Sequence, residues 1–122
     1  MHYLYVSLGA ALGGAARYWL SNFVYRVLPA TFPYGTLLVN VLGSFLLGLL
    51  VFFIFERSTL SSEWRMLLTV GFCGGFTTFS TFSLETVNLL RNTEYLMATF
   101  NIAANVILTI GAVLLAFFLS QR

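Results

Sequence analysis

The segment of this chain most able to do chemistry is residues 71–83, which read GFCGGFTTFSTFS. Its adjacent glycines, Gly74 and Gly75, each weaken a helix by about 1 kcal/mol relative to alanine, and five hydroxyl side chains and three phenylalanines follow within eight residues. Hydroxyl groups donate hydrogen bonds to anions, and the positive edge of a phenyl ring can meet a small anion. Backbone carbonyls freed at a helix break can bind a cation. The segment therefore predicts an ion site near Phe79 and Phe82, although such rings outside a polar context would indicate lipid contact or packing.

Three polar residues share one helical face of the C-terminal apolar segment, because Asn101, Asn105 and Thr109 are spaced at i, i+4 and i+8. Polar groups in a membrane helix are costly unless they bond to another helix or face water. Two interpretations follow with about equal weight: hydrogen bonds between helices, or a ladder of donors along a pore. Asn40, followed by Ser44 at i+4, presents the same choice in the second apolar segment.

A single arginine lies well inside the first apolar segment. Arg17 is about 20 Å along a helix counted from Leu4, at 1.5 Å per residue. An arginine at such a depth usually faces a cavity or a partner. Glu85 is a possible carboxylate partner, and snorkelling to the membrane surface is a second structural interpretation. We favour a third, in which Arg17 forms an electropositive vestibule that attracts anions.

The elements that must position these residues are four apolar segments of about the 20 residues that a span requires. Short polar connections separate them, and aromatic residues near their ends fit a membrane–water interface. Gly9 and Gly13, like Gly43 and Gly48, predict close helix packing. We expect an all-α membrane protein with one four-helix transmembrane channel domain over residues 1–122, whose third helix breaks in mid-membrane. The segments are Tyr3–Leu28, Tyr34–Phe55, Trp64–Leu90 and Tyr95–Leu119.

Composition agrees with a membrane setting and excludes several functions. Hydrophobic residues make up 59% of the 122 residues and charged residues only 8%, against about 25% charged in a soluble domain. The lone Cys73 excludes an internal disulfide and a cysteine-based zinc cluster. The net charge of +2 comes from scattered arginines, so no basic patch predicts binding to nucleic acid. No interior histidine, paired carboxylates or metal-ligand cluster predicts an enzyme.

The distribution of arginines predicts little preference for one orientation in the membrane. With four spans, Arg57, Arg65 and Arg122 lie on one side and Arg26 and Arg91 on the other. Arginine and lysine bias sets topology, and three against two is almost no bias. The chain could therefore insert in both orientations, and we expect it to pair with itself as an antiparallel homodimer.

Taken together, three blocks of sequence resemble the Fluc (CrcB-type) family of small fluoride channels over essentially the whole length. They are residues 16–19 (ARYW), residues 35–40 (GTLLVN) and the 71–83 segment followed by Glu85. The resemblance implies an antiparallel, dual-topology homodimer in a bacterial-type inner cell membrane. Its two pores would export fluoride passively, reject chloride and so confer fluoride resistance.

The resemblance also implies roles for individual residues. Arg17 would lie near a vestibule, and Glu85 would follow the helix break. A structural sodium ion at the dimer centre would be held by backbone carbonyls of Gly74 and Thr77 from both subunits. Val113 stands where several members carry a threonine, so the resemblance does not determine which residue forms the outer end of the polar track. The implied pore residues are Phe79, Phe82, Asn40, Ser80, Thr81, Asn101, Asn105 and Thr109.

Two other classes of membrane protein compete with this interpretation. A small dual-topology four-helix multidrug exporter needs a membrane-embedded carboxylate, typically in its first helix, where this chain has Arg17 and no acid. A non-transporting assembly subunit would use every polar residue above for contacts between helices. Flux through the purified protein distinguishes the second alternative from a channel.

Overall fold

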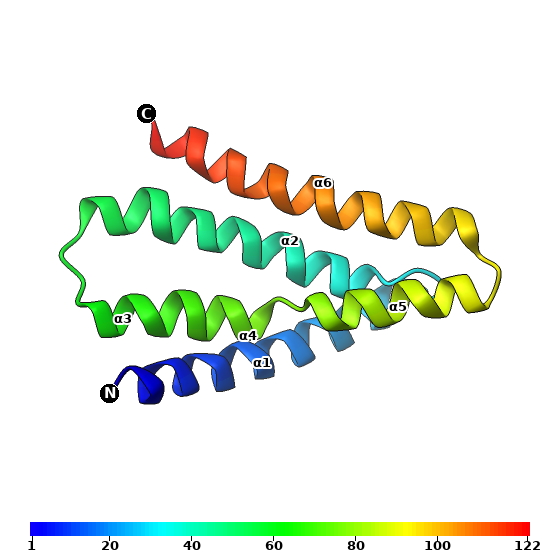
Figure 1. Ribbon diagram of the computed structural model, residues 1–122, viewed down its shortest axis with the longest axis horizontal. Coiled ribbons are helices and arrows are strands. Elements are labelled where there is room, and N and C mark those ends of the chain that lie inside the picture. The colour runs from blue at the N-terminus through cyan, green and yellow to red at the C-terminus, as the bar shows by residue number, and fades with distance from the viewer.

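The computed structural model describes residues 1–122 as four helical rods joined by short connections, with no strands (Figure 1). The first rod is α1, and the second begins with α2 and continues through a π-helical stretch, η1, into a 3-10 turn, η2. The third contains α3, the π-helical η3, the short α4 and, after a break, α5. The fourth is α6. Their bounds are α1 His2–Val27, α2 Tyr34–Gly48, η1 Leu49–Ile54, η2 Phe55–Arg57, α3 Ser62–Met66, η3 Leu67–Cys73, α4 Gly74–Phe76, α5 Phe79–Arg91 and α6 Tyr95–Ser120.

Three of the four rods are long and apolar enough to cross a membrane. They cover Tyr34–Arg57, Ser62–Arg91 and Tyr95–Ser120, with mean hydropathies of 2.6, 1.3 and 2.5. The rod α1 has 26 residues, which is long enough to cross a membrane, but its mean hydropathy is lower than that of the other three rods. The all-helical membrane class is confirmed, and the fourth span stays a prediction.

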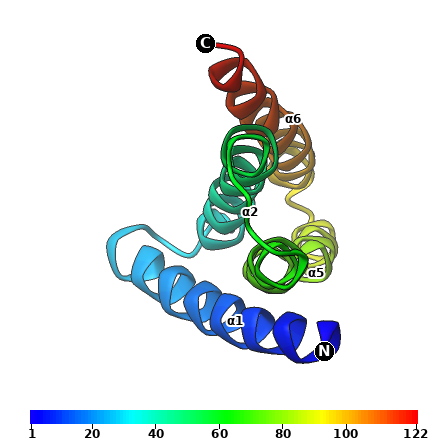
Figure 2. The ribbon, with the colours of Figure 1, turned by 90° about the vertical axis from the view of Figure 1, so that its left-hand side faces the viewer.

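Glycines allow α1 to pack closely on the first half of the third rod. A Cβ atom added to Gly75 would lie 2.7 Å from the carbonyl oxygen of Ala10, and one added to Gly71 would lie 2.8 Å from that of Val6. Gly9 and Gly13 face the backbone of the third rod in the same way. Viewed along the rods, α2 lies between α6 on one side and α1 and the third rod on the other (Figure 2). The prediction that Gly9 and Gly13 serve packing is confirmed.

The helix break lies two residues beyond the position that the glycines indicate. Gly74 and Gly75 are helical, and the chain becomes extended only at Thr77 (φ −86°, ψ 159°) and Thr78 (φ −150°, ψ 112°). The expected break in the third helix is present, but it does not lie at the glycine pair, because Gly75 serves the contact with α1. Two β-branched threonines form the break instead, and the Thr78 hydroxyl caps α5 by accepting the Thr81 N–H at 3.2 Å.

Gly13→Ala should destabilise the protein, whereas Gly14→Ala should not. A Cβ on Gly13 would lie 2.9 Å from the backbone nitrogen of Phe76, but a Cβ on Gly14 would meet no atom within 4 Å. We expect Gly13→Ala to lower the free energy of unfolding by about 1–3 kcal/mol through overpacking. Unfolding in mixed detergent micelles, followed by circular dichroism, measures the difference. Equal effects of the two substitutions would contradict the packing of α1 on the third rod.

Candidate functional site

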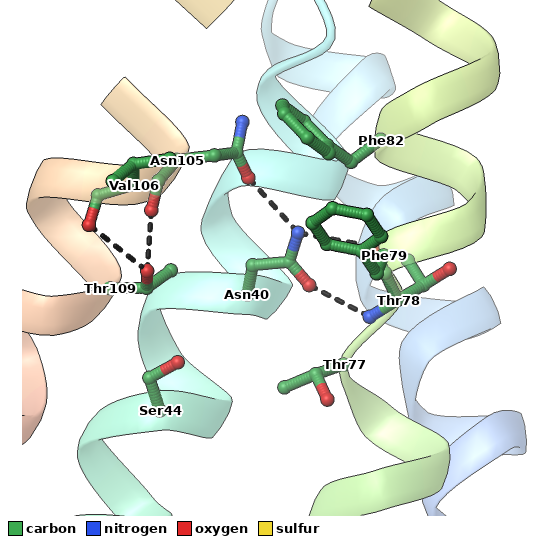
Figure 3. A pocket seen from close by; sticks show the side chains of 9 residues that line it. All are labelled: Asn40, Ser44, Thr77, Thr78, Phe79, Phe82, Asn105, Val106 and Thr109. Carbon is green, nitrogen blue, oxygen red and sulfur yellow. Dashed lines mark hydrogen bonds between the residues drawn. The ribbon is translucent and has the colours of Figure 1, made fainter. Parts of the chain in front are cut away.

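A polar hollow of about 220 Å³ opens where α2, the break and α6 meet. The break falls midway along the third rod, so the hollow lies at membrane depth (Figure 1). No charged side chain lines it. Figure 3 shows its lining residues, which are Asn40 and Ser44 of α2, Thr77 and Thr78 of the break, Phe79 and Phe82 of α5, and Asn105, Val106 and Thr109 of α6.

The side chain of Asn40 holds the break open. Its Oδ1 atom accepts the Thr78 backbone N–H at 2.7 Å, and its Nδ2 atom donates to the Thr78 carbonyl at 3.2 Å. In a continuous α-helix the Thr78 N–H would donate to the carbonyl of Gly74. Asn40 therefore replaces the helical partner of Thr78, which explains how an extended pair of residues is tolerated inside a membrane span.

A chain of amide hydrogen bonds continues from Asn40 across two further helices. Asn40 Nδ2 donates to Asn105 Oδ1 at 3.0 Å, and Asn105 Nδ2 donates to Asn101 Oδ1 at 3.0 Å. Asn101, which is fully buried and does not line the hollow, donates from Nδ2 to the Thr86 hydroxyl at 3.0 Å. Both hydrogens of the Asn40 amide are thus used within the protein. The interpretation of these asparagines as contacts between helices is confirmed, and a role as ion donors stays a prediction.

The two predicted aromatic residues lie together at the edge of the hollow. The ring centroids of Phe79 and Phe82 are 5.3 Å apart and their planes are tilted by 53° (Figure 3). Phe82 is 8% exposed, but Phe79 is 78% exposed. In a single chain the hollow is therefore not enclosed by protein on the side of Phe79.

Other predicted pore residues divide between this hollow and its surroundings. Thr109 lines the hollow and donates its hydroxyl proton to the Asn105 carbonyl. Ser80 and Thr81 follow the break but do not line the hollow in one chain. Thr81 instead accepts a 3.0 Å hydrogen bond from the Thr78 hydroxyl, within the cap of α5. The structure does not bring Ser80 and Thr81 together with Asn105 and Thr109.

Arg17 and Glu85 do not form the ion pair that one interpretation allowed. Arg17 Nε donates to the Gly75 carbonyl at 3.0 Å, so the arginine binds one of the last carbonyls of α4. Glu85 lines a separate hollow of about 470 Å³ with Tyr25 and Glu94, and its Oε1 atom is buried without a hydrogen-bond partner. The pairing is wrong, and the vestibule role of Arg17 stays a prediction.

The sequence did not single out two residues that stabilise the site, Thr78 and Thr86. Thr78 belongs to the motif but was not distinguished from its neighbours, although it anchors the break. Thr86 accepts from Asn101 and donates to the Phe82 carbonyl at 2.8 Å. It follows Phe82 at i+4, so the search for polar residues on one face, applied to the third rod, would have found it.

The fold and the site define a small helical membrane protein whose polar groups gather at a break in the middle of a span. Residues 4–117 match the family described as "CrcB-like protein, Camphor Resistance (CrcB)", and the chain belongs to this family. The resemblance drawn from the sequence is confirmed.

Several relatives match along almost their full length, and each is named "Fluoride-specific ion channel FluC". The protein of Pyrococcus abyssi is 50% identical over 121 residues, which cover 98% of this chain and 95% of the relative. That of Pyrococcus furiosus is 53% identical over 119 residues, covering 96% and 94%. That of Coxiella burnetii is 43% identical over 123 residues, covering 100% and 99%.

Asn40→Ala should destabilise the protein and loosen the break, because it leaves both backbone groups of Thr78 without their partner. An orphaned buried polar group costs about 1–3 kcal/mol, and we expect a loss of about that size in the free energy of unfolding. Amide hydrogen exchange should accelerate at Thr78. Asn88→Ala is the matched control, since Asn88 is an exposed amide on α5. Unchanged exchange at Thr78 would show that Asn40 does not hold the break.

Proposed function

We propose that this chain is a fluoride-selective anion channel through which fluoride leaves the cell passively across the inner membrane. Membership of the CrcB-like family and the printed names of the relatives support the proposal. The observation that carries it for this chain is the hollow beside the break at membrane depth. Its lining consists of neutral polar groups and two phenyl rings, which are suited to an anion that must enter and then leave.

Selectivity follows from the need to replace the water around a small, strongly hydrated ion. Closely placed hydroxyl donors and positive ring edges offer such replacement without a fixed cation that would hold the ion too tightly. The rings of Phe79 and Phe82, 5.3 Å apart, provide stiff walls that resist widening around a larger halide. Chloride would be excluded because the same donors cannot close around it as well.

A second copy of the chain, inserted in the opposite orientation, would complete the pore. Phe79 is 78% exposed and Val70 is 55% exposed, and Gly74 is also exposed on the third rod. The almost balanced arginines allow both orientations, so an antiparallel homodimer can form from one gene product. Its two-fold symmetry would give two equivalent pores.

The backbone near the break suits a structural sodium ion at the centre of that dimer. The Thr78 N–H donates to Asn40, so the Gly74 carbonyl is released from its usual helical bond. Arg17 occupies the neighbouring Gly75 carbonyl. The candidates are the carbonyls of Gly74 and Thr77, which the resemblance to the family implies. Carbonyl oxygens at an unwound helix are the donors that bind sodium in transporters. The ion would supply positive charge that fixes two copies together.

Two alternative functions predict different polar residues or contacts from those of a channel. A proton-coupled exporter needs a carboxylate in the first helix, but α1 carries Arg17 bound to a carbonyl and no acid. A non-transporting assembly subunit is favoured by one observation, the internal saturation of the Asn40 and Asn105 amides. Such a subunit would conduct no ion when the purified protein is placed in liposomes.

Liposomes that contain only this purified protein should release fluoride rapidly and chloride negligibly. A fluoride electrode and a chloride electrode, used on the same preparation, measure the two effluxes. The narrow, neutral lining of the hollow is the reason to expect the difference. If correctly folded protein released no fluoride, the channel proposal would be contradicted and the assembly subunit would be favoured.

Replacing either ring should slow fluoride efflux by about tenfold or more. Phe79→Ile and Phe82→Ile remove the ring edge, an attraction of a few kcal/mol at most, while keeping an apolar side chain of similar bulk. Phe100→Ile is the control, because Phe100 is 63% exposed on α6 and does not line the hollow. A loss of the same size for all three substitutions would indicate a general effect on stability rather than a role in the pore.

Labelling should show that the chain inserts in both orientations. Cys73 is 2% exposed, so a cysteine introduced at Asn92→Cys in the α5–α6 turn should be the only reactive thiol. With a membrane-impermeant thiol reagent, about half of the protein in intact cells should react from outside, as expected for unbiased arginines. Adding Thr59→Arg and Ser61→Arg in the α2–α3 connection should shift that fraction. Complete labelling or complete protection without the added arginines would rule out dual topology.

A further inference from the structure

One hydroxyl group in the polar hollow has no partner within the protein. Ser44 lines the hollow on α2 (Figure 3), and its side chain forms no hydrogen bond with the rest of the protein. A hydroxyl in a membrane helix normally donates to the carbonyl four residues earlier. Such i−4 bonds are made by Ser7, Thr69, Thr77, Ser83, Thr86, Thr99 and Thr109.

Ser44 also stands where the first hollow meets a second one. Ser44 and Thr77 line both the 220 Å³ hollow and a neighbouring hollow of about 350 Å³ that reaches Thr69, Val70 and Gly74. The Thr77 hydroxyl donates to the Cys73 carbonyl at 2.9 Å, so its proton is already used. Of the two side chains at this junction, Ser44 alone has a proton free to donate.

Val113 on α6 lies close to α2. A Cβ added to Gly48 would lie 3.4 Å from the Val113 Cα atom, so Val113 packs against α2. The polar lining of the first hollow on α6 ends at Thr109. The lining residues continue instead past Ser44 towards the exposed face of the third rod.

We propose that the Ser44 hydroxyl is a further ion-contacting residue, which donates a hydrogen bond to the anion as it passes through the 220 Å³ hollow. This proposal rests on the proposed channel function. It adds Ser44 of α2 to the side chains that the anion meets beside Asn105 and Thr109 in the first hollow. The asparagine amides keep their structural bonds while the ion passes, because the donor that it meets is the one that the protein leaves unused.

Fluoride efflux from liposomes tests the role of this hydroxyl. Ser44→Ala should slow fluoride efflux by about tenfold, the loss expected for one hydrogen bond to a charged group, and Ser44→Thr should remain within about twofold of the parent. Ser7→Ala is the matched control, since Ser7 is exposed on α1 and bonded to its own helix. If the parent conducts fluoride and Ser44→Ala conducts equally well, this proposal is overturned while the channel stands. If the parent does not conduct, the channel itself fails.

Thiol accessibility tests the same pathway without measuring flux. Ser44→Cys should react with a small, water-soluble thiol reagent, whereas Leu42→Cys should not, because Leu42 is 44% exposed on α2 and lines neither polar hollow. Because Cys73, although only 2% exposed, also lines the second hollow, both variants are made in a Cys73→Ala background. Fluoride should slow the reaction at Ser44→Cys. Equal reactivity of the two cysteines, or a thiol at position 44 that never reacts in folded protein, would overturn the proposal.

Discussion

The two hydrogen bonds between Asn40 and the backbone of Thr78 are the interaction on which the rest of the site depends. Hydrocarbon offers no partner to a backbone group released from a helix, so an extended pair inside a span needs protein partners. Asn40 supplies an acceptor and a donor from one side chain, at 2.7 and 3.2 Å. Beyond the break α5 begins at Phe79, and Phe79 and Phe82 line the same hollow as residues of α2 and α6.

Three arginines bind backbone carbonyls at the ends of helical segments. Arg17 binds the Gly75 carbonyl, Arg57 binds that of Ser120 at 2.9 Å, and Arg65 binds that of Phe55 at 3.2 Å. Each carbonyl belongs to the end of a helical segment, where partners are lacking and the helix dipole is negative. The arginines therefore stabilise segment ends without acidic partners, and the polar lining stays neutral.

Amides and hydroxyls serve different purposes in this fold. The amides of Asn40, Asn101 and Asn105 connect α2, α5 and α6, and their groups are occupied by one another and by Thr78 and Thr86. Ring edges and the Ser44 hydroxyl lie free at the same hollow. The amides of this cluster thus serve structural contacts, and the side chains without such contacts are the ones that we propose meet an ion. A stiff amide framework allows neighbouring groups to meet an ion without rearrangement.

The sequence alone determined the membrane class, the helical segments and the pairing of Phe79 with Phe82, because hydropathy and i, i+3 spacing are local properties. It also determined the family through the 71–83 motif. Only the tertiary structure decided that the break falls at Thr77–Thr78, since contact with α1 holds Gly75 in a helix. It likewise decided that Arg17 binds Gly75 rather than Glu85, and that Asn40 is occupied while Ser44 is free. These choices depend on which helices meet, and hydrogen-bond partners 38 or 58 residues apart leave no trace in local spacing.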